Sequence, residues 1–105
     1  MKHKIGFIGL GLIGGSIAKA IRQYYPDYEI VAFDKNKESL ALATQESMID
    51  VAATTIDNNF QNCNYIFLCA PVAYNTAYLK QILLLVSSAA VFFHHTPYKP
   101  CIIKH

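Results

Sequence analysis

The spacing of hydrophobic residues changes along the first third of this chain, and the change outlines its elements. Residues 4–8 are an almost wholly apolar run, as in a strand buried on both faces of a parallel sheet. After this run, apolar positions recur in steps of three and four, which predicts an amphipathic helix that Pro26 ends near Tyr25. The positions expected to face the sheet are Ile13, Ile17, Ala20, Ile21 and Tyr24.

The rest of the chain repeats this succession of strand and helix. Further strands are expected at residues 29–34, 49–54, 65–69 and 89–93. Helices are expected over residues 37–46, capped by Asn36, and from about residue 73, and residues 56–62 predict a loop or single helical turn capped by Asp57. Apolar positions expected toward the sheet are Leu40, Ala43 and Leu42, then Tyr74, Tyr78, Ile82 and Leu85. This alternation predicts an α/β fold, a Rossmann-type doubly wound, mostly parallel sheet of about five strands.

Composition narrows the function classes. The chain has 105 residues, room for one domain, with 53% hydrophobic and only 15% charged residues. Its net charge of +2, with no basic cluster, gives no reason to expect a nucleic-acid partner. No apolar run is long enough for a membrane span. Its three cysteines form no C-x-x-C pair, so we expect reduced thiols and a cytoplasmic protein.

All five glycines of the chain fall between residues 6 and 15. Gly9, Gly11 and Gly14 have the G-x-G-x-x-G spacing of a dinucleotide-binding turn, between a predicted strand and a predicted helix. In such a turn the backbone approaches a pyrophosphate at the helix start, where the dipole favours an anion. Residues 1–20 begin with basic residues and end in Ala18-Lys19-Ala20, so they also resemble a secretory signal peptide. This is the alternative to a dinucleotide-binding turn.

Asp34 ends the second predicted strand, 20 residues after Gly14, where the ribose-binding carboxylate of an NAD site belongs. A carboxylate there accepts hydrogen bonds from the adenosine ribose hydroxyls and repels a 2′-phosphate, which favours NAD over NADP. Lys35 weakens that preference, because a cation can partly neutralise a phosphate. The predicted cofactor is therefore NAD, with Asp34 and Lys35 beside its adenosine ribose.

A second candidate segment is Cys69-Ala70-Pro71-Val72, where Pro71 terminates the fourth predicted strand. Ligands of open α/β sheets bind beyond the carboxyl ends of the strands, so this segment is expected to line the nicotinamide half of the pocket. Cys69 has no neighbouring histidine or other activating group. We therefore interpret it as a small core residue at a strand end and not as a nucleophile.

The segment Gly9-Leu10-Gly11-Leu12-Ile13-Gly14-Gly15-Ser16 resembles the opening of prephenate dehydrogenases, and Asp34 and the Ala70-Pro71-Val72 turn are similar to the same family. The resemblance covers residues 4–93 and is shared in part with arogenate and β-hydroxyacid dehydrogenases. It implies NAD-dependent oxidative decarboxylation of prephenate, on the path to tyrosine. By position, it implies that the pyrophosphate is held by Gly9, Gly11, Leu12, Ile13 and Gly14, and that Cys69, Ala70, Pro71 and Val72 lie near the nicotinamide ribose.

Residues 94–105 depart from that family, so we divide the chain into a dinucleotide-binding domain, 1–93, and a divergent tail, 94–105. The family's catalytic histidine, substrate-binding arginines and helical dimerisation domain would come later, so no catalytic residue is assigned. We therefore expect a truncated or frame-shifted product that is inactive alone. We also expect it to self-associate through its uncovered apolar face. His94, His95, Cys101 and His105 fit no standard zinc spacing, so we expect a solvated tail and no metal.

Two other functions share parts of this pattern. Nucleotide-sensing regulatory domains of potassium transporters have the same glycine turn and terminal acid, but the Gly15-Ser16 continuation and the Ala-Pro-Val turn argue against that class. An NADP-dependent reductase domain is disfavoured by Asp34.

Overall fold

Four parallel strands form the main part of the sheet. The computed structural model describes residues 3–69, 72–85, 90–92 and 101–104. Within them, strands run in the order β3-β2-β1-β4, and all three pairings are parallel. Their bounds are β1 Lys4–Ile8, β2 Glu29–Phe33, β3 Val51–Ala53 and β4 Tyr65–Leu68. The predicted Rossmann-type α/β fold is confirmed, and each of the four strands lies where the sequence predicts it.

The outer part of the sheet differs from the prediction. Strand β5, Ala90–Phe92, does not pair with β4, because β6, Cys101–Lys104, lies between them and is antiparallel to both. We expected a solvated tail from residue 94, and for Cys101–Lys104 that expectation is wrong. The pairing of Phe67 with Ile102 and of Ile66 with Ile103 shows the reason, since an apolar segment of the tail completes the hydrogen bonding of β4.

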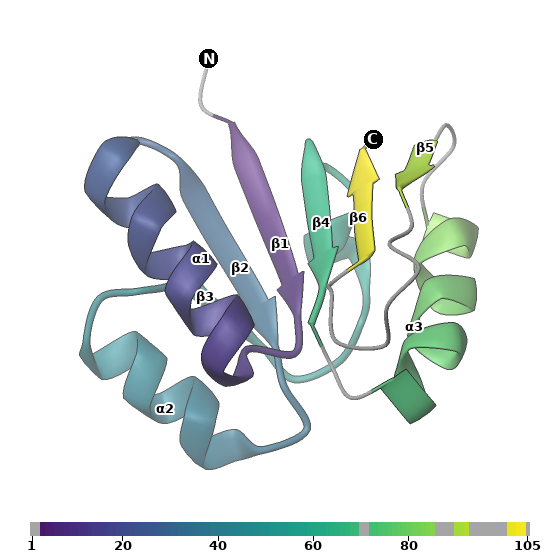
Figure 1. Cartoon of the computed structure of the whole chain (residues 1–105), viewed down its shortest axis with the longest axis horizontal. Coiled ribbons are helices and arrows are strands. Elements are labelled where there is room, and N and C mark those ends of the chain that lie inside the picture. The colour runs from purple at the N-terminus through teal and green to yellow at the C-terminus, as the bar shows by residue number, and fades with distance from the viewer. Residues whose placement is uncertain (1–2, 70–71, 86–89, 93–100, 105) are drawn as a thin grey trace.

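In the described part of the chain, three α-helices and one 3₁₀ turn connect the strands. Their bounds are α1 Gly11–Tyr24, α2 Lys37–Gln45, η1 Asn58–Phe60 and α3 Val72–Leu85. All three α-helices start at the edge of the sheet where β1, β2 and β4 end, the lower edge in Figure 1. This arrangement follows from right-handed parallel crossovers, which return the chain to the amino edge after each strand.

Two hydrophobic cores lie on opposite faces of the sheet, because side chains alternate along each strand. In β1, Ile5 and Phe7 pack with α1 and α2, whereas Ile8 packs with η1 and α3. Both β1 and β2 are buried on both faces, which explains why their sequences read as continuous apolar runs. The sheet with helices on both faces is the three-layer arrangement of a doubly wound fold.

Two predicted helix faces need correction. In α1, Ala20 is exposed and Tyr24 is 72% exposed, while Gly14 and Ala18 are buried. The side of α1 that carries Gly14 and Ala18 faces the sheet, because these small residues allow the helix to approach the sheet most closely. In α2, Leu40 and Ala43 are buried as predicted, but Leu42 is 56% exposed.

Along α3, Ile82 is fully buried and Tyr78 and Leu85 pack against the same core, as predicted. The side chains of Ile13 and Tyr74 lie outside the described residues.

The ends of α2 are fixed by local hydrogen bonds. Asn36 caps the first turn, as predicted, since its side-chain oxygen accepts from the Glu38 and Ser39 N–H groups. The helix ends in a Schellman motif, in which Met48 N–H donates to Ala43 O at 2.9 Å and Ser47 N–H donates to Thr44 O at 3.1 Å. Ser47 takes the left-handed position of this motif, with φ 59°.

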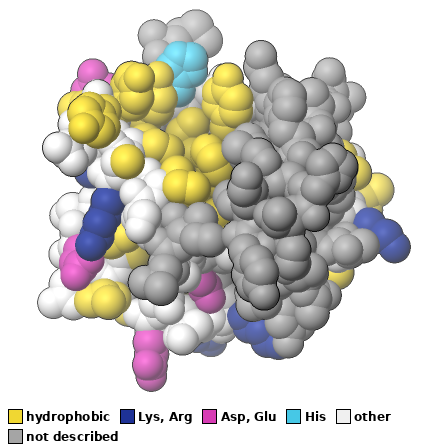
Figure 2. Space-filling view, in the orientation of Figure 1, with side chains coloured by type: hydrophobic (Ala, Val, Ile, Leu, Met, Phe, Trp, Pro, Cys, Tyr) yellow, Lys and Arg dark blue, Asp and Glu magenta, His cyan; other side chains and the backbone are white. Residues whose placement is uncertain are grey.

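The predicted turn after β3 is also present, since Asp57 caps η1 by accepting from Asn59 N–H at 2.9 Å. Among the described residues, no helix is long and apolar enough to cross a membrane. Figure 2 shows hydrophobic side chains gathered around His3, at the amino edge of the sheet and away from the helix starts. The exposed residues at the end of α1 include Tyr24 and Tyr25.

Candidate functional site

The candidate site lies at the carboxyl ends of β1, β2 and β4. In the strand order β3-β2-β1-β4, the chain adds β2 and β3 on one side of β1 and then crosses back to place β4 on the other side. In open parallel sheets, ligands bind beyond the carboxyl ends of the strands at the point where the strand order reverses, which here lies between β1 and β4. The glycine turn, Asp34 and Cys69 all follow directly after these strands, so the structure brings the predicted site residues to one edge.

The turn between β1 and α1 depends on two glycines with left-handed backbone. Gly9 has φ 85° and Gly11 has φ 54°, which side-chain-bearing residues rarely adopt. Gly9 N–H donates to Phe33 O at 2.6 Å, so the turn is anchored to the end of β2. Among the described residues, a Cβ on Gly11 would meet no atom within 4 Å beyond its chain neighbours and the backbone of its own helix, so this glycine borders open space. Gly11 is therefore a position where a ligand has access to the backbone.

Gly14 has a different role, because it allows α1 to lie against the turn and the end of β4. A Cβ at this position would be 2.9 Å from Gly9 O and 3.2 Å from Cys69 Cβ. This is the close approach that the third glycine of the fingerprint is expected to provide. The contact with Cys69 connects the two segments that the sequence analysis singled out.

Gly6, in contrast, serves packing away from the site. A Cβ there would be 2.9 Å from Phe60 Cδ1 and 3.0 Å from Cys63 Sγ, under η1. Not every glycine of the cluster faces the candidate ligand site.

Asp34 is half-buried and is held by backbone donors from two segments. Its Oδ2 accepts from Leu10 N–H at 2.9 Å, and its Oδ1 accepts from Asn36 N–H at 2.8 Å. Each carboxylate oxygen can accept more than one hydrogen bond, so acceptor capacity remains for ribose hydroxyls. The bond to Leu10 was not predicted from the sequence, because a backbone N–H donor has no residue signature.

The start of α1 offers backbone donors to an anion. Leu10 is the N-cap residue and makes no side-chain cap, and the first turn, which includes the predicted site residues Leu12 and Ile13, contains no acidic residue. The first N–H groups of an α-helix lack partners within the helix, and the dipole adds a partial positive charge. The described turn thus has the donors and the open space at Gly11 that a pyrophosphate group requires.

Cys69 follows β4 beside Gly14 and is a packing residue, partly buried against the core that contains Phe7. Its N–H donates to Ile8 O at 2.8 Å, continuing the pairing of β4 with β1. Burial raises the pKa of the Cys69 thiol to about 12, so the reactive thiolate is scarce near neutral pH. The prediction that Cys69 is not a nucleophile agrees with this environment.

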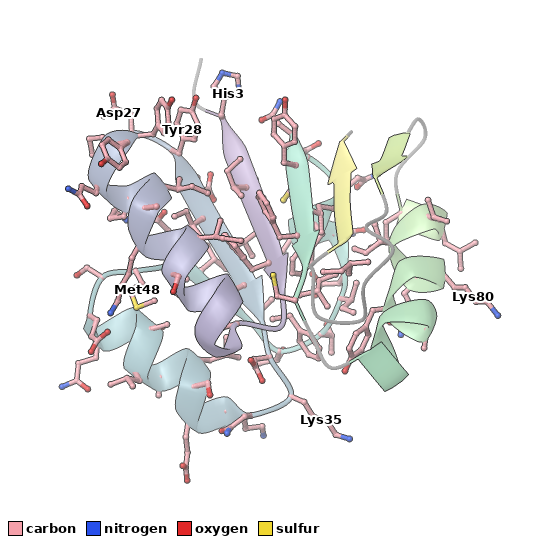
Figure 3. The ribbon with its side chains drawn as sticks, viewed as in Figure 1. His3, Asp27, Tyr28, Lys35, Met48 and Lys80 are labelled. Carbon is pink, nitrogen blue, oxygen red and sulfur yellow. The ribbon has the colours of Figure 1, made fainter. Side chains whose placement is uncertain are left out.

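The remaining predicted site residues are described only in part. Ala70 and Pro71 lie outside the described residues, and Val72 begins α3 without a described side chain. Lys35 is exposed and points outward from the loop between β2 and α2 in Figure 3. His94, His95 and His105 also lie outside the described residues, as does the side chain of Cys101. Among the side chains that are described, no three metal-ligating groups gather.

Comparison with known proteins identifies the family. The model of a family described as NADP oxidoreductase, coenzyme F420-dependent, matches residues 4–91. The chain belongs to this family. This oxidoreductase family supports the dehydrogenase interpretation over a regulatory domain of a transporter.

The chain is also similar to prephenate and arogenate dehydrogenases. It is 37% identical over 79 residues to a prephenate dehydrogenase of Lactococcus lactis subsp. cremoris (strain MG1363), covering 75% of this chain and 22% of the relative. A crystal structure of A. aeolicus prephenate dehydrogenase, in complex with hydroxyphenyl propionate and NAD+, matches with a TM-score of 0.74 and 27% identity. That match covers 83% of this chain and 31% of the other. Synechocystis arogenate dehydrogenase matches with a TM-score of 0.71 and 27% identity, over 80% and 29% of the two chains.

These similarities confirm the resemblance to prephenate dehydrogenases that the glycine turn indicates. They also define its extent, since the chain spans only 22% of the length of the curated prephenate dehydrogenases that it matches.

Proposed function

We propose that this chain is the NAD-binding part of a dehydrogenase that oxidises and decarboxylates prephenate to 4-hydroxyphenylpyruvate. The observation that carries the proposal is Asp34, whose carboxylate is fixed beside the glycine turn by Leu10 and Asn36. Similarity to an A. aeolicus prephenate dehydrogenase whose structure contains NAD+ supports the choice of reaction and cofactor.

In the proposed complex, the N–H groups at the start of α1 bind the pyrophosphate, and open space at Gly11 admits it. Asp34 accepts hydrogen bonds from the adenosine ribose, and exposed Lys35 lies at the outer side of that pocket. Cys69 and the segment Ala70–Val72 border the nicotinamide ribose. Bound NAD would supply a hydride acceptor; the residues described here bind and orient it, and none of them is assigned as a catalytic acid or base.

The preference for NAD needs a direct test, because the family description names NADP. A carboxylate at the ribose position repels a 2′-phosphate, so we expect NAD to bind at least tenfold more tightly than NADP. Calorimetric titration of the purified chain with each nucleotide measures this ratio. Tighter binding of NADP would reject the assignment of NAD, and binding of neither would reject a nucleotide site in this chain.

A matched pair of variants tests whether Asp34 is responsible. Asp34→Asn keeps the size of the side chain and removes its charge, so NAD affinity should fall and the discrimination against NADP should narrow. Asp57→Asn is the control, since Asp57 makes the same kind of turn, with its Oδ1 accepting from Asn59 N–H, away from the glycine turn. Equal NAD affinities of the two variants would contradict the ribose-binding role of Asp34.

The reaction itself is tested by adding prephenate and NAD to the purified chain. Because the chain spans 22% of the length of its curated relatives, we expect NAD binding with little or no turnover. Robust NADH formation would contradict this expectation. Arogenate, tested in parallel, covers the other substrate that appears among the similar proteins.

We also propose that the chain self-associates through apolar surface and that it works in the cytoplasm. Leu84 and Leu83 on α3 are 89% and 45% exposed, which supports the first proposal. The free thiols of Cys63 and Cys69 support the second, because they suit a reducing compartment. Analytical ultracentrifugation of the native chain and of a Leu84→Lys variant tests self-association; a monomer at high concentration would contradict it.

A further inference from the structure

Asp34 connects two segments that lie apart in the sequence. Its two oxygens accept from Leu10 N–H, in the glycine turn, and from Asn36 N–H, at the cap of α2. The Asn36 bond is local, two residues along the chain, and occurs in any Asx turn. The bond to Leu10 spans 24 residues and crosses from the end of β2 to the turn after β1.

The turn that receives this bond has little stiffness of its own. Leu10 stands between Gly9 and Gly11, both with positive φ, and glycine has the widest choice of backbone conformations. Leu10 makes no side-chain cap for α1. Two hydrogen bonds tie the turn to the end of β2, one from Gly9 N–H to Phe33 O and the other from Leu10 N–H to Asp34.

We propose that Asp34 is also a positioning residue, which holds the glycine turn in its pyrophosphate-binding shape before a nucleotide arrives. This proposal deepens the proposed function and rests on it for the identity of the ligand. A turn fixed in advance loses less conformational freedom on binding, so the nucleotide binds more tightly. The contact with ribose is separate, because the carboxylate keeps acceptor capacity beyond its two backbone bonds.

The two bonds can be separated by one substitution. In Asp34→Ser the short hydroxyl still accepts from Asn36 N–H in a serine turn, but it does not reach Leu10. Asp57→Ser is the matched control, because Asp57 accepts from Asn59 N–H, also two residues along the chain, and from Thr55 Oγ1, and both donors lie outside the glycine turn. Asp34→Ala, compared with Asp57→Ala, is the second pair if the serine variant folds poorly.

Amide hydrogen exchange of the nucleotide-free chain, followed by NMR, tests the positioning role directly. We expect the Leu10 amide to exchange at least tenfold faster in Asp34→Ser than in the native chain. Amides within β1 and β2 should change by less than twofold, and Asp57→Ser should leave Leu10 as in the native chain. Unchanged exchange at Leu10 would overturn the proposal.

Binding of 2′,3′-dideoxy-ADP separates positioning from ribose recognition, because this ligand keeps the diphosphate and lacks the ribose hydroxyls. If Asp34 acts only on ribose, Asp34→Ser should bind it as well as the native chain or more tightly, since an anion is removed near the diphosphate. A positioning role predicts binding at least threefold weaker, with Asp57→Ser unchanged. Equal or tighter binding by Asp34→Ser would overturn the proposal. If the native chain binds no nucleotide, the proposed function fails, whereas the exchange experiment still decides whether Asp34 holds the turn.

Discussion

Replacing Gly14 by alanine is expected to destabilise the domain, whereas the same change at the next residue, Gly15, should stabilise it. Both glycines lie early in α1, so each substitution gains similar helix propensity, about 1 kcal/mol. Their surroundings differ. A Cβ at Gly14 would be 2.9 Å from Gly9 O, while one at Gly15 would meet its nearest neighbour, Met48 Cε, at 3.6 Å, an ordinary contact.

The cost at Gly14 follows from what the new methyl group meets. Gly9 O belongs to the backbone of the turn, and Cys69 Cβ, at 3.2 Å, is fixed to the end of β4, so neither can rotate away. Overpacking of this kind costs about 1–3 kcal/mol. Gly14→Ala is thus expected to lose up to about 2 kcal/mol net, and Gly15→Ala to gain roughly 1 kcal/mol. The difference between the two variants isolates the steric term, about 1–3 kcal/mol.

Thermal unfolding followed by circular dichroism measures this difference. For a domain of this size, 1 kcal/mol shifts the midpoint by roughly 4–8 °C, so a difference of about 2 kcal/mol separates the two variants by roughly 8–16 °C. Titration with NAD adds a second readout. Gly14→Ala should bind NAD more weakly than the native chain, and Gly15→Ala should bind it with the native affinity. Equal midpoints, or a more stable Gly14→Ala, would refute the inference that α1 is held against the turn through this glycine.

Four further predictions concern positions outside the turn. Ser47→Gly should raise the free energy of unfolding by about 1 kcal/mol, because Ser47 has φ 59°; an unchanged thermal midpoint would contradict this. Asn36→Ala should lower the free energy of unfolding by about 1 kcal/mol, because the cap of α2 is lost. Urea unfolding measures this change, with Lys37→Ala, at the next residue, as the control. Burial raises the pKa of the Cys63 and Cys69 thiols from 9.0 to about 12, so both should resist alkylation at pH 8 in the folded chain, as peptide mapping would show. Because both thiols titrate at lower pH when unfolded, their contribution to stability should be complete below pH 9 and fall as the pH rises toward 12; a flat profile over that range would contradict the burial.

The part of the site that the sequence predicts is the part encoded by side-chain type at fixed spacing. Gly9, Gly11 and Gly14 follow an apolar run, and Asp34 closes the next one, so local pattern alone places them at one edge of a parallel sheet. The bond between Asp34 and Leu10 could not be predicted in the same way. Its donor is a backbone N–H, which every residue except proline carries.

The wrong predictions about the fold also concern features that side-chain type does not encode. The face of α1 that meets the sheet is set by Gly14 and Ala18, whose small size permits close contact but adds little to a hydrophobic pattern. Strand β6 is short and pairs with β4 far back in the chain, so no local signal distinguishes it from a solvated tail. Pairing over such a distance depends on tertiary contacts, which sequence pattern does not report.

The place of β6 has a consequence for how the chain is assembled during synthesis. Among the described strands, β5 is made before β6 but pairs only with it, so β5 has no place in the sheet until Cys101–Lys104 has left the ribosome. Strands β1 to β4, in contrast, pair with one another and can come together as they emerge. During that interval β4 presents an unpaired edge, a surface on which nascent chains associate wrongly. A released chain cut off before residue 101 would therefore keep the strands that flank its glycine turn and Asp34, but one side of its sheet would be open.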